Sequence, residues 1–150
     1  MIREATLQDV DQIVLLGVKF IKDSPMFRDH PINIKRMQQY AIRTIREDNK
    51  CYFVDDRDGK IVAFLSGYVS PMIYSDDLVA NEQLMFVDPD YKSSTRVGIR
   101  LMRKFEEWSR NKGVKIMWFS PTSHGVDDRW NAFCKTLGYV PQGGIFQKRL

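Results

Sequence analysis

The strongest constraint on the fold is a change of hydrophobic period in the second half of the chain. The run LVANEQLMFV (78–87) has the composition of a strand, residues 97–111 carry apolar side chains at helical spacing, and residues 115–120 form a second apolar run. Asp88-Pro89 ends the first run, and Gly113 is placed to close the helix. Two strands joined through one helix favour a parallel crossover, so we expect a parallel pair in the sheet.

The first half of the chain predicts two helices followed by a hairpin. A short strand at 2–4 is followed by Thr6 and Asp9, which resemble a capping box at the start of the first helix. The proline-containing segment 23–31 ends this helix, and the second helix follows it. Two runs rich in β-formers then flank Asp-Arg-Asp-Gly at 56–59, which is typical of a hairpin turn.

The end of the chain predicts one more helix and the closing strands. Asp127 or Asp128 can cap a helix that ends at Gly138, and residues 139–150 are expected to form one or two strands. With no repeat or linker in the sequence, we predict one α/β domain over residues 1–150. Its sheet is expected to be mixed, with six or seven strands and four flanking helices.

Composition favours a protein of a reducing compartment, without a metal centre. Cys51 and Cys134 lack the paired spacings of a zinc site and are too few for a disulfide scaffold, and neither His30 nor His124 has a ligand partner at metal spacing. Acidic residues near the start exclude a secretory signal, and no apolar run reaches the roughly 18 residues of a membrane span. We therefore expect a cytoplasmic location and no membrane partner.

The positive charge is concentrated in one segment. The chain carries a net charge of +4, but residues 92–115 alone hold eight cations against two acids. The helix start inside this segment offers unpaired backbone N–H groups and the positive end of the helix dipole, which together bind anions. Gly98 would let a ligand approach the backbone closely. The segment is also compatible with an ordinary solvated helix face.

The whole chain resembles the GNAT superfamily of acetyl-CoA-dependent N-acyltransferases. Three segments carry the likeness: IREATLQDVDQIVLL, LMFVDPDYKSSTRVGIRLMRKFEEWSRNKG and FCKTLGYVPQGGIFQKRL. The resemblance implies a mostly antiparallel sheet with a splayed central parallel pair. It also implies acetyl-CoA as cosubstrate, with the pantetheine arm along the backbone of Phe86 and Val87. The pyrophosphate would be held at the helix start, by Lys92, Ser93, Ser94, Thr95, Arg96, Val97, Gly98 and Ile99.

The sequence departs from the family pattern at two positions of this loop. The family has Gln or Arg where Ser93 stands and glycine where Arg96 stands, and only Gly98 matches. Arg96 could contact phosphate directly or crowd the loop. Asp127 stands where the family often has an asparagine near the cofactor, and it could equally be a helix cap.

The resemblance also assigns candidate catalytic groups. A backbone N–H near Val87 would stabilise the oxyanion, and Glu82 would be the general base, while Cys134 stands where many members have an acidic tyrosine. Strict alternation would instead place Glu82 on the same face as Leu84 and Phe86, unless a bulge changes that face. Cys134 could also be a small core residue. Tyr91 and Tyr139 cannot be ranked as replacements for it.

The acceptor is expected to be a small-molecule or protein amine. The resemblance implies that it is recognised by two loops that vary in the family, 23–31 and 70–77. Two alternatives remain open. One is a catalytically degenerate member that binds coenzyme A or a protein, motivated by Ser93, Arg96 and Cys134. The other, a nucleic-acid module, is disfavoured because no aromatic residues interleave with the basic ones. A homodimer is possible.

Overall fold

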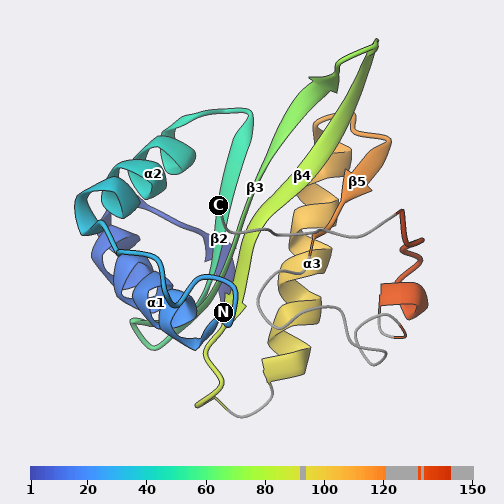
Figure 1. Cartoon of the computed structure of the whole chain (residues 1–150). Coiled ribbons are helices and arrows are strands. Elements are labelled where there is room, and N and C mark those ends of the chain that lie inside the picture. The colour runs from blue at the N-terminus through green and yellow to red at the C-terminus, as the bar shows by residue number, and fades with distance from the viewer. Residues whose placement is uncertain (92–93, 121–131, 133, 143–150) are drawn as a thin grey trace.

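One five-stranded sheet organises the part of the chain that the computed structural model describes, which is residues 1–91, 94–120, 132 and 134–142 (Figure 1). The strands lie in chain order: β1 (Ile2–Glu4), β2 (Lys50–Arg57), β3 (Lys60–Met72), β4 (Ser75–Val87) and β5 (Ile116–Trp118). Neighbours are antiparallel from β1 to β4, and β5 is parallel to β4. The mixed sheet and its parallel pair are thus confirmed.

The number of strands differs from the prediction of six or seven. Among the described residues, 139–142 are not in a strand, and the rest of the predicted closing strands, 143–150, lies outside them. Ser70–Asp77 was expected to be a loop, but β3 and β4 extend through it and leave only the turn Ile73-Tyr74. This long hairpin projects beyond the rest of the sheet (Figure 1).

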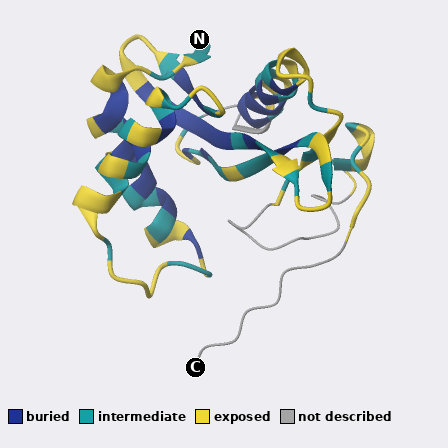
Figure 2. Ribbon diagram, turned by 90° about the horizontal axis from the view of Figure 1, so that it is seen from above, coloured by how far each residue is buried: buried dark blue, intermediate teal, exposed yellow. Residues whose placement is uncertain are grey.

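Helices cover both faces of the sheet. The first two helices, α1 (Val10–Asp23) and α2 (Ile34–Arg46), pack on one face, and α3 (Ser94–Asn111) packs on the other (Figure 2). A 3-10 turn, η1 (Leu7–Asp9), leads into α1. Two buried clusters result, the α1–α2 core around Phe64 and the α3 core around Phe105.

Local sequence signals explain where several elements begin and end. The capping box of Thr6 and Asp9 is present, and the β2–β3 turn places Asp58 and Gly59 at φ 54° and 86°, as a primed hairpin turn requires. Gly113 closes α3 with φ 77°. Residues 132 and 134–136 are helical, and Gly138, at φ 85°, follows them as predicted.

Candidate functional site

The parallel pair β4–β5 forms a fork. Pairing is limited to three positions, Val79–Ile116, Ala80–Met117 and Asn81–Trp118. Beyond Asn81, β4 continues along β3 to Val87, but no described strand lies on its other side (Figure 1). Within the described part of the chain, residues 82–87 therefore present one backbone edge without a strand partner.

The direction of the N–H groups along this edge follows from one hydrogen bond. Asp88 donates its backbone N–H to the carbonyl oxygen of Val62, at 2.9 Å, on the β3 side. Since successive N–H groups of a strand point to opposite edges, the N–H of Val87 points to the open edge. The N–H of Phe86 points back to β3.

A β-bulge sits at the mouth of the fork. Leu84 pairs with Ser66 and Glu82 with Gly67, so Gln83 is an extra residue in β4. Gln83 and Leu84 both face α1 and α2, because the Gln83 Oε1 atom accepts a hydrogen bond from the Tyr40 hydroxyl at 2.9 Å and Leu84 packs against the α1–α2 core. The prediction of strict alternation was wrong here, and the bulge that was its alternative is present.

The bulge turns the Glu82 carboxylate toward the end of β5. Its Oε2 atom accepts a hydrogen bond from the backbone N–H of Ser120, at 3.3 Å. Burial raises the pKa of Glu82 to about 8, although this hydrogen bond favours the ionised form. A carboxyl group that releases its proton near pH 8 has the basicity that a general base for an amine needs.

Tyr139 lies at the same site. Its pKa is raised to about 12, first by burial and further by the charges of Glu106, Cys134 and Glu82. Burial also raises the pKa of the Cys134 thiol. Both groups hence hold their protons at neutral pH. Tyr91 lies elsewhere, with the Lys60 ammonium 5.1 Å from its ring centre, so the structure ranks Tyr139 above Tyr91, which sequence reasoning could not do.

The predicted cofactor loop is described in part. Helix α3 begins at Ser94, with Arg96 exposed, Val97 buried in the α3 core and Ile99 half-buried. A Cβ atom added at Gly98 would lie 4.0 Å from the side chains of Met85 and Val87, so the helix start lies beside the end of β4. Of the other predicted cofactor contacts, Lys92, Ser93 and Asp127 lie outside the described residues, as do the side chains of Ser94 and Thr95.

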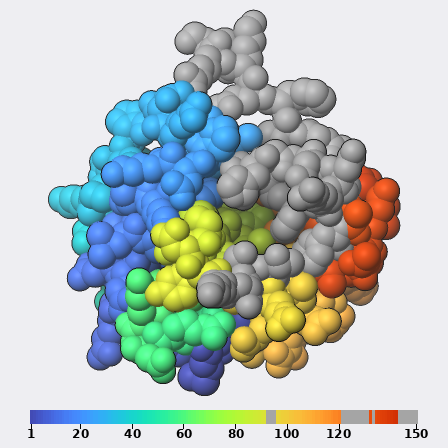
Figure 3. Space-filling model, turned by 90° about the horizontal axis from the view of Figure 1, so that it is seen from below, coloured from blue at the N-terminus to red at the C-terminus, as the bar shows by residue number. Residues whose placement is uncertain are grey.

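Two ion pairs fix the segment that follows β4. The Lys19 ammonium on α1 lies 2.5 Å from carboxylate oxygens of both Asp88 and Asp90. In Figure 3 this segment, in yellow-green, lies on the surface between α1 and the first turns of α3. The chain entering the helix start is therefore anchored at its β4 end.

The basic face of α3 is partly neutralised by its own acids. Lys104 pairs with Glu107 at 3.2 Å, and Arg110 pairs with Glu106. The second half of the helix thus has the pattern of a solvated face, and Arg96 stands apart in the first turn. Among the described residues, no group of three His, Cys, Asp or Glu side chains could hold a metal ion, and no helix could cross a membrane.

Of the two segments expected to recognise the acceptor, one borders a cavity. Phe27, His30 and Pro31 from the connection between α1 and α2 line a pocket on the α1–α2 face of the sheet. Ile73 and Tyr74, in contrast, are fully or largely exposed at the hairpin tip and do not line it. The pocket was not predicted from the sequence, because its lining comes from two helices, three strands and the connection between the helices.

Comparisons with known proteins agree with this geometry. Residues 19–139 match the acetyltransferase (GNAT) family. No curated protein sequence matches the chain.

Several solved structures share the fold. The aminoglycoside N-acetyltransferase AAC(6')-Iy, in complex with the bisubstrate analogue CoA-S-monomethyl-acetylneamine, has a TM-score of 0.73 and 16% identity over 100% of this chain and 97% of that one. A ribosomal-protein-alanine N-acetyltransferase from Brucella melitensis biovar Abortus has a TM-score of 0.70 and 12% identity, over 100% of this chain and 99% of that one. An aminoglycoside acetyltransferase from an uncultured soil metagenomic sample, in complex with sisomicin, has a TM-score of 0.70 and 19% identity, over 100% of this chain and 95% of that one. At these identities the likeness shows the fold.

Proposed function

Because the chain belongs to the acetyltransferase (GNAT) family, we propose that it is an acetyl-CoA-dependent N-acetyltransferase that acetylates a primary amine by direct attack in a ternary complex. The observation that carries this proposal is the fork between β4 and β5, with the half-buried Glu82 carboxylate at its mouth. The acceptor amine and the thioester would meet there.

The residues at the fork fit a pantetheine arm and a pyrophosphate. The open edge of β4 can pair with an extended amide-containing chain as it would with another strand. The helix start beside it supplies N–H groups and a partial positive charge. Outside the backbone of its own helix, the atoms nearest to a Cβ at Gly98 belong to the side chains of Met85 and Val87, at 4.0 Å, so this helix start lies directly beside the open edge of β4.

Each chemical task has a group on the chain. When bound, acetyl-CoA supplies an acetyl group activated as a thioester. Glu82, once ionised, accepts the proton of the acceptor ammonium, so that the neutral amine can form the new C–N bond. The N–H of Val87 donates to the carbonyl oxygen as negative charge develops on it. Tyr139 gives a proton to the departing thiolate as the C–S bond breaks, in place of the Cys134 predicted for that role, and takes up the proton that the nitrogen loses as it becomes an amide.

A catalytically degenerate member is the second candidate. Arg96, at a family glycine position, has an exposed side chain in the first turn of α3, where it could support coenzyme binding without turnover. The two candidates share acetyl-CoA binding and differ in release of free coenzyme A.

Calorimetric titration with acetyl-CoA, read together with thermal stability, tests both. We expect micromolar binding and a rise in Tm with ligand concentration, since a ligand that binds only the folded state stabilises it by mass action. Thiol release with a panel of primary amines would then establish the enzyme. Binding without thiol release would favour the degenerate member, and absence of binding at millimolar acetyl-CoA would overturn both.

Reversal of charge at Arg96 tests the anion site. In Arg96→Glu we expect acetyl-CoA affinity to fall by roughly 10- to 100-fold, the effect of removing a hydrogen bond from a charged donor. Stability should be unchanged because the side chain is exposed. Arg103→Glu, with the same charge change at an exposed position later in α3, is the matched control. Equal affinities of the two variants would contradict a phosphate contact at Arg96.

Gly98→Ala tests the close approach of phosphate to the backbone. The added methyl group meets only ordinary contacts at 4.0 Å, and alanine is the better helix former, so Tm of the free protein should be equal or higher. Acetyl-CoA affinity should fall on the order of tenfold, because the methyl group occupies the space proposed for phosphate. An unchanged Kd in calorimetry would show that phosphate does not approach this position.

A further inference from the structure

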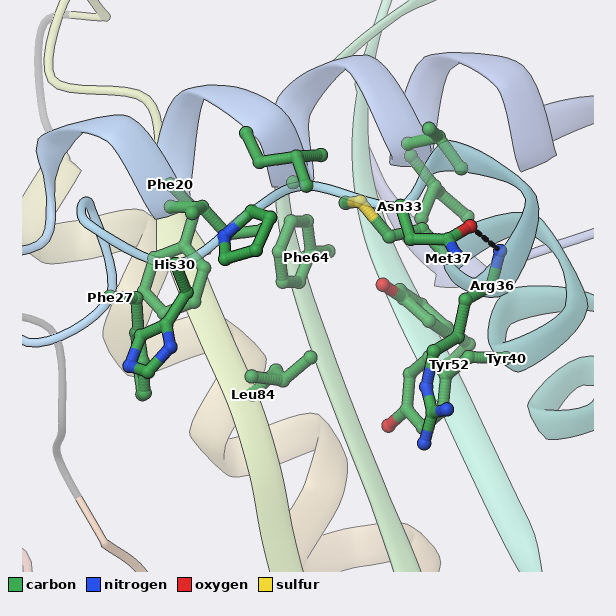
Figure 4. A pocket seen from close by; sticks show the side chains of 16 residues that line it. Phe20, Phe27, His30, Asn33, Arg36, Met37, Tyr40, Tyr52, Phe64 and Leu84 are labelled. Carbon is green, nitrogen blue, oxygen red and sulfur yellow. Dashed lines mark hydrogen bonds between the residues drawn. The ribbon is translucent and has the colours of Figure 1, made fainter. Parts of the chain in front are cut away.

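A pocket of about 400 Å³ opens on the α1–α2 face of the sheet (Figure 4). Its volume lies within the roughly 300–1,000 Å³ of small-molecule sites. Phe64 of β3 and Leu84 of β4 form the floor, with Phe20, Phe27 and His30 at one end and Arg36, Tyr40 and Tyr52 at the other (Figure 4).

Within the described part of the chain, the lining is mostly apolar and includes no acidic residue. None of the sixteen residues that line the pocket is Asp or Glu, and the single formally charged side chain among them is Arg36, at the rim. A ligand carrying several ammonium groups would lose hydration here without gaining a carboxylate partner. An aromatic or aliphatic group, in contrast, would gain from leaving water.

The inner end of the pocket reaches the bulge in β4. Leu84 on the floor is two residues from Glu82, and Tyr40 donates a hydrogen bond to Gln83, the residue between them. Tyr40 also lies 2.9 Å from the buried Ser66 hydroxyl. The Glu82 side chain itself lies on the opposite face of β4. Burial raises the pKa of Tyr40, and the charge of Glu82 reaches the Tyr40 hydroxyl and raises this pKa further. The Tyr40 end of the pocket is therefore within electrostatic reach of the residue proposed to take up the proton.

We propose that this pocket binds the apolar body of the acceptor, and that the acceptor is a primary monoamine on an aromatic or aliphatic group. This inference rests on the proposed function and adds the substrate class to it. It separates this chain from the two neighbours whose structures contain an aminoglycoside or its analogue, since a polycation does not suit a pocket without acids.

Gly17 gives a way to fill the pocket from α1. A Cβ atom at this position would lie 2.8 Å from the terminal methyl group of Met37, a flexible side chain that can move aside. Gly17→Leu should thus place its side chain in the cavity. Lys22→Leu adds the same side chain to an exposed position of the same helix and is the matched control.

The test is calorimetric binding of 2-phenylethylamine and of sisomicin to the full chain, with and without acetyl-CoA. We expect 2-phenylethylamine to bind the wild type and Lys22→Leu alike and sisomicin not to bind. Gly17→Leu should bind 2-phenylethylamine at least tenfold more weakly. If this variant does not fold, the methyl resonance of Met37 in the wild-type protein, assigned from Met37→Leu, should shift on addition of 2-phenylethylamine.

Failure of the inference and failure of the proposed function give different results. A protein that binds acetyl-CoA but not 2-phenylethylamine, or that binds sisomicin instead, overturns the substrate class alone. So does 2-phenylethylamine binding that neither responds to Gly17→Leu nor shifts Met37. A protein that binds 2-phenylethylamine but not acetyl-CoA overturns the proposed function, and with it the acceptor role of the pocket.

Discussion

Replacement of Glu82 by glutamine is expected to lower kcat/KM by roughly 10²- to 10⁴-fold, the usual contribution of a general base. The amide keeps the shape of the side chain and can still accept the hydrogen bond from Ser120, but it cannot take up a proton. Acetyl-CoA affinity should be unchanged, because the proposed cofactor contacts lie further along β4 and at the start of α3. Glu107→Gln, at an exposed position of α3, is the control.

The pH dependence gives this prediction a second readout. With the pKa of Glu82 raised to about 8, the rate of the wild-type protein should increase through that pH as the carboxyl group ionises. The residual rate of Glu82→Gln should lack this increase. A variant with the wild-type rate at every pH would exclude Glu82 as the base.

Glu82→Gln should also change how the free energy of unfolding depends on pH, because the pKa of Glu82 differs between the folded and unfolded states. Glu82 releases its proton near its ordinary pKa of 4.5 in the unfolded chain, but at about 8 in the folded protein. Between these values the folded state binds more protons than the unfolded state, so the free energy of unfolding falls as pH rises. Glu82→Gln has no carboxyl group at this position, so this decrease in its free energy of unfolding between pH 4.5 and 8 is absent. Its Tm relative to the wild type should therefore rise from pH 4.5 to 8 and stay level above.

Much of the fold could be predicted because its signals are local. Helical and strand periods, the turn at Asp58-Gly59 and the closing glycines Gly113 and Gly138 each depend on a few neighbouring residues. The extension of β3 and β4 through residues 70–77 was missed, since Pro71 and two aspartates resemble a loop. The long-range pairing of the two strands outweighs these weak local preferences.

The candidate site was less predictable because it depends on contacts between distant elements. Glu82 could be named as the acid of its strand, but its direction depends on a bulge that appears only when β4 is paired with β3. Tyr139 could not be ranked above Tyr91 until packing placed its ring 6.0 Å from that of Phe119. Similarly, no sequence pattern marks a pocket whose floor and walls are far apart in the chain.

A methyl group at Gly67 should have the largest effect on folding among the glycine substitutions. Gly67 is buried in β3, opposite Glu82, and an added Cβ atom would lie 2.6 Å from the Phe105 ring and 2.8 Å from the carbonyl oxygen of Asn81. The ring is fully buried and the carbonyl belongs to the backbone, so neither can move without repacking. Overpacking of this kind destabilises by about 1–3 kcal/mol or more, and each kcal/mol lowers Tm by about 2–4 °C at this chain length.

The position of the clash links this loss of stability to the fork. Asn81 is the last residue of β4 that pairs with β5, so a shift of its backbone moves the point where the strands separate. Gly67→Ala should consequently lose activity even at temperatures where it is folded. Combined with Phe105→Leu, it should recover part of its stability, because the ring contact is relieved while the contact with Asn81 remains. Thermal unfolding and kcat/KM of the single and double variants measure both effects. A Gly67→Ala protein as stable and active as Gly98→Ala would show that β3, β4 and α3 do not approach each other this closely.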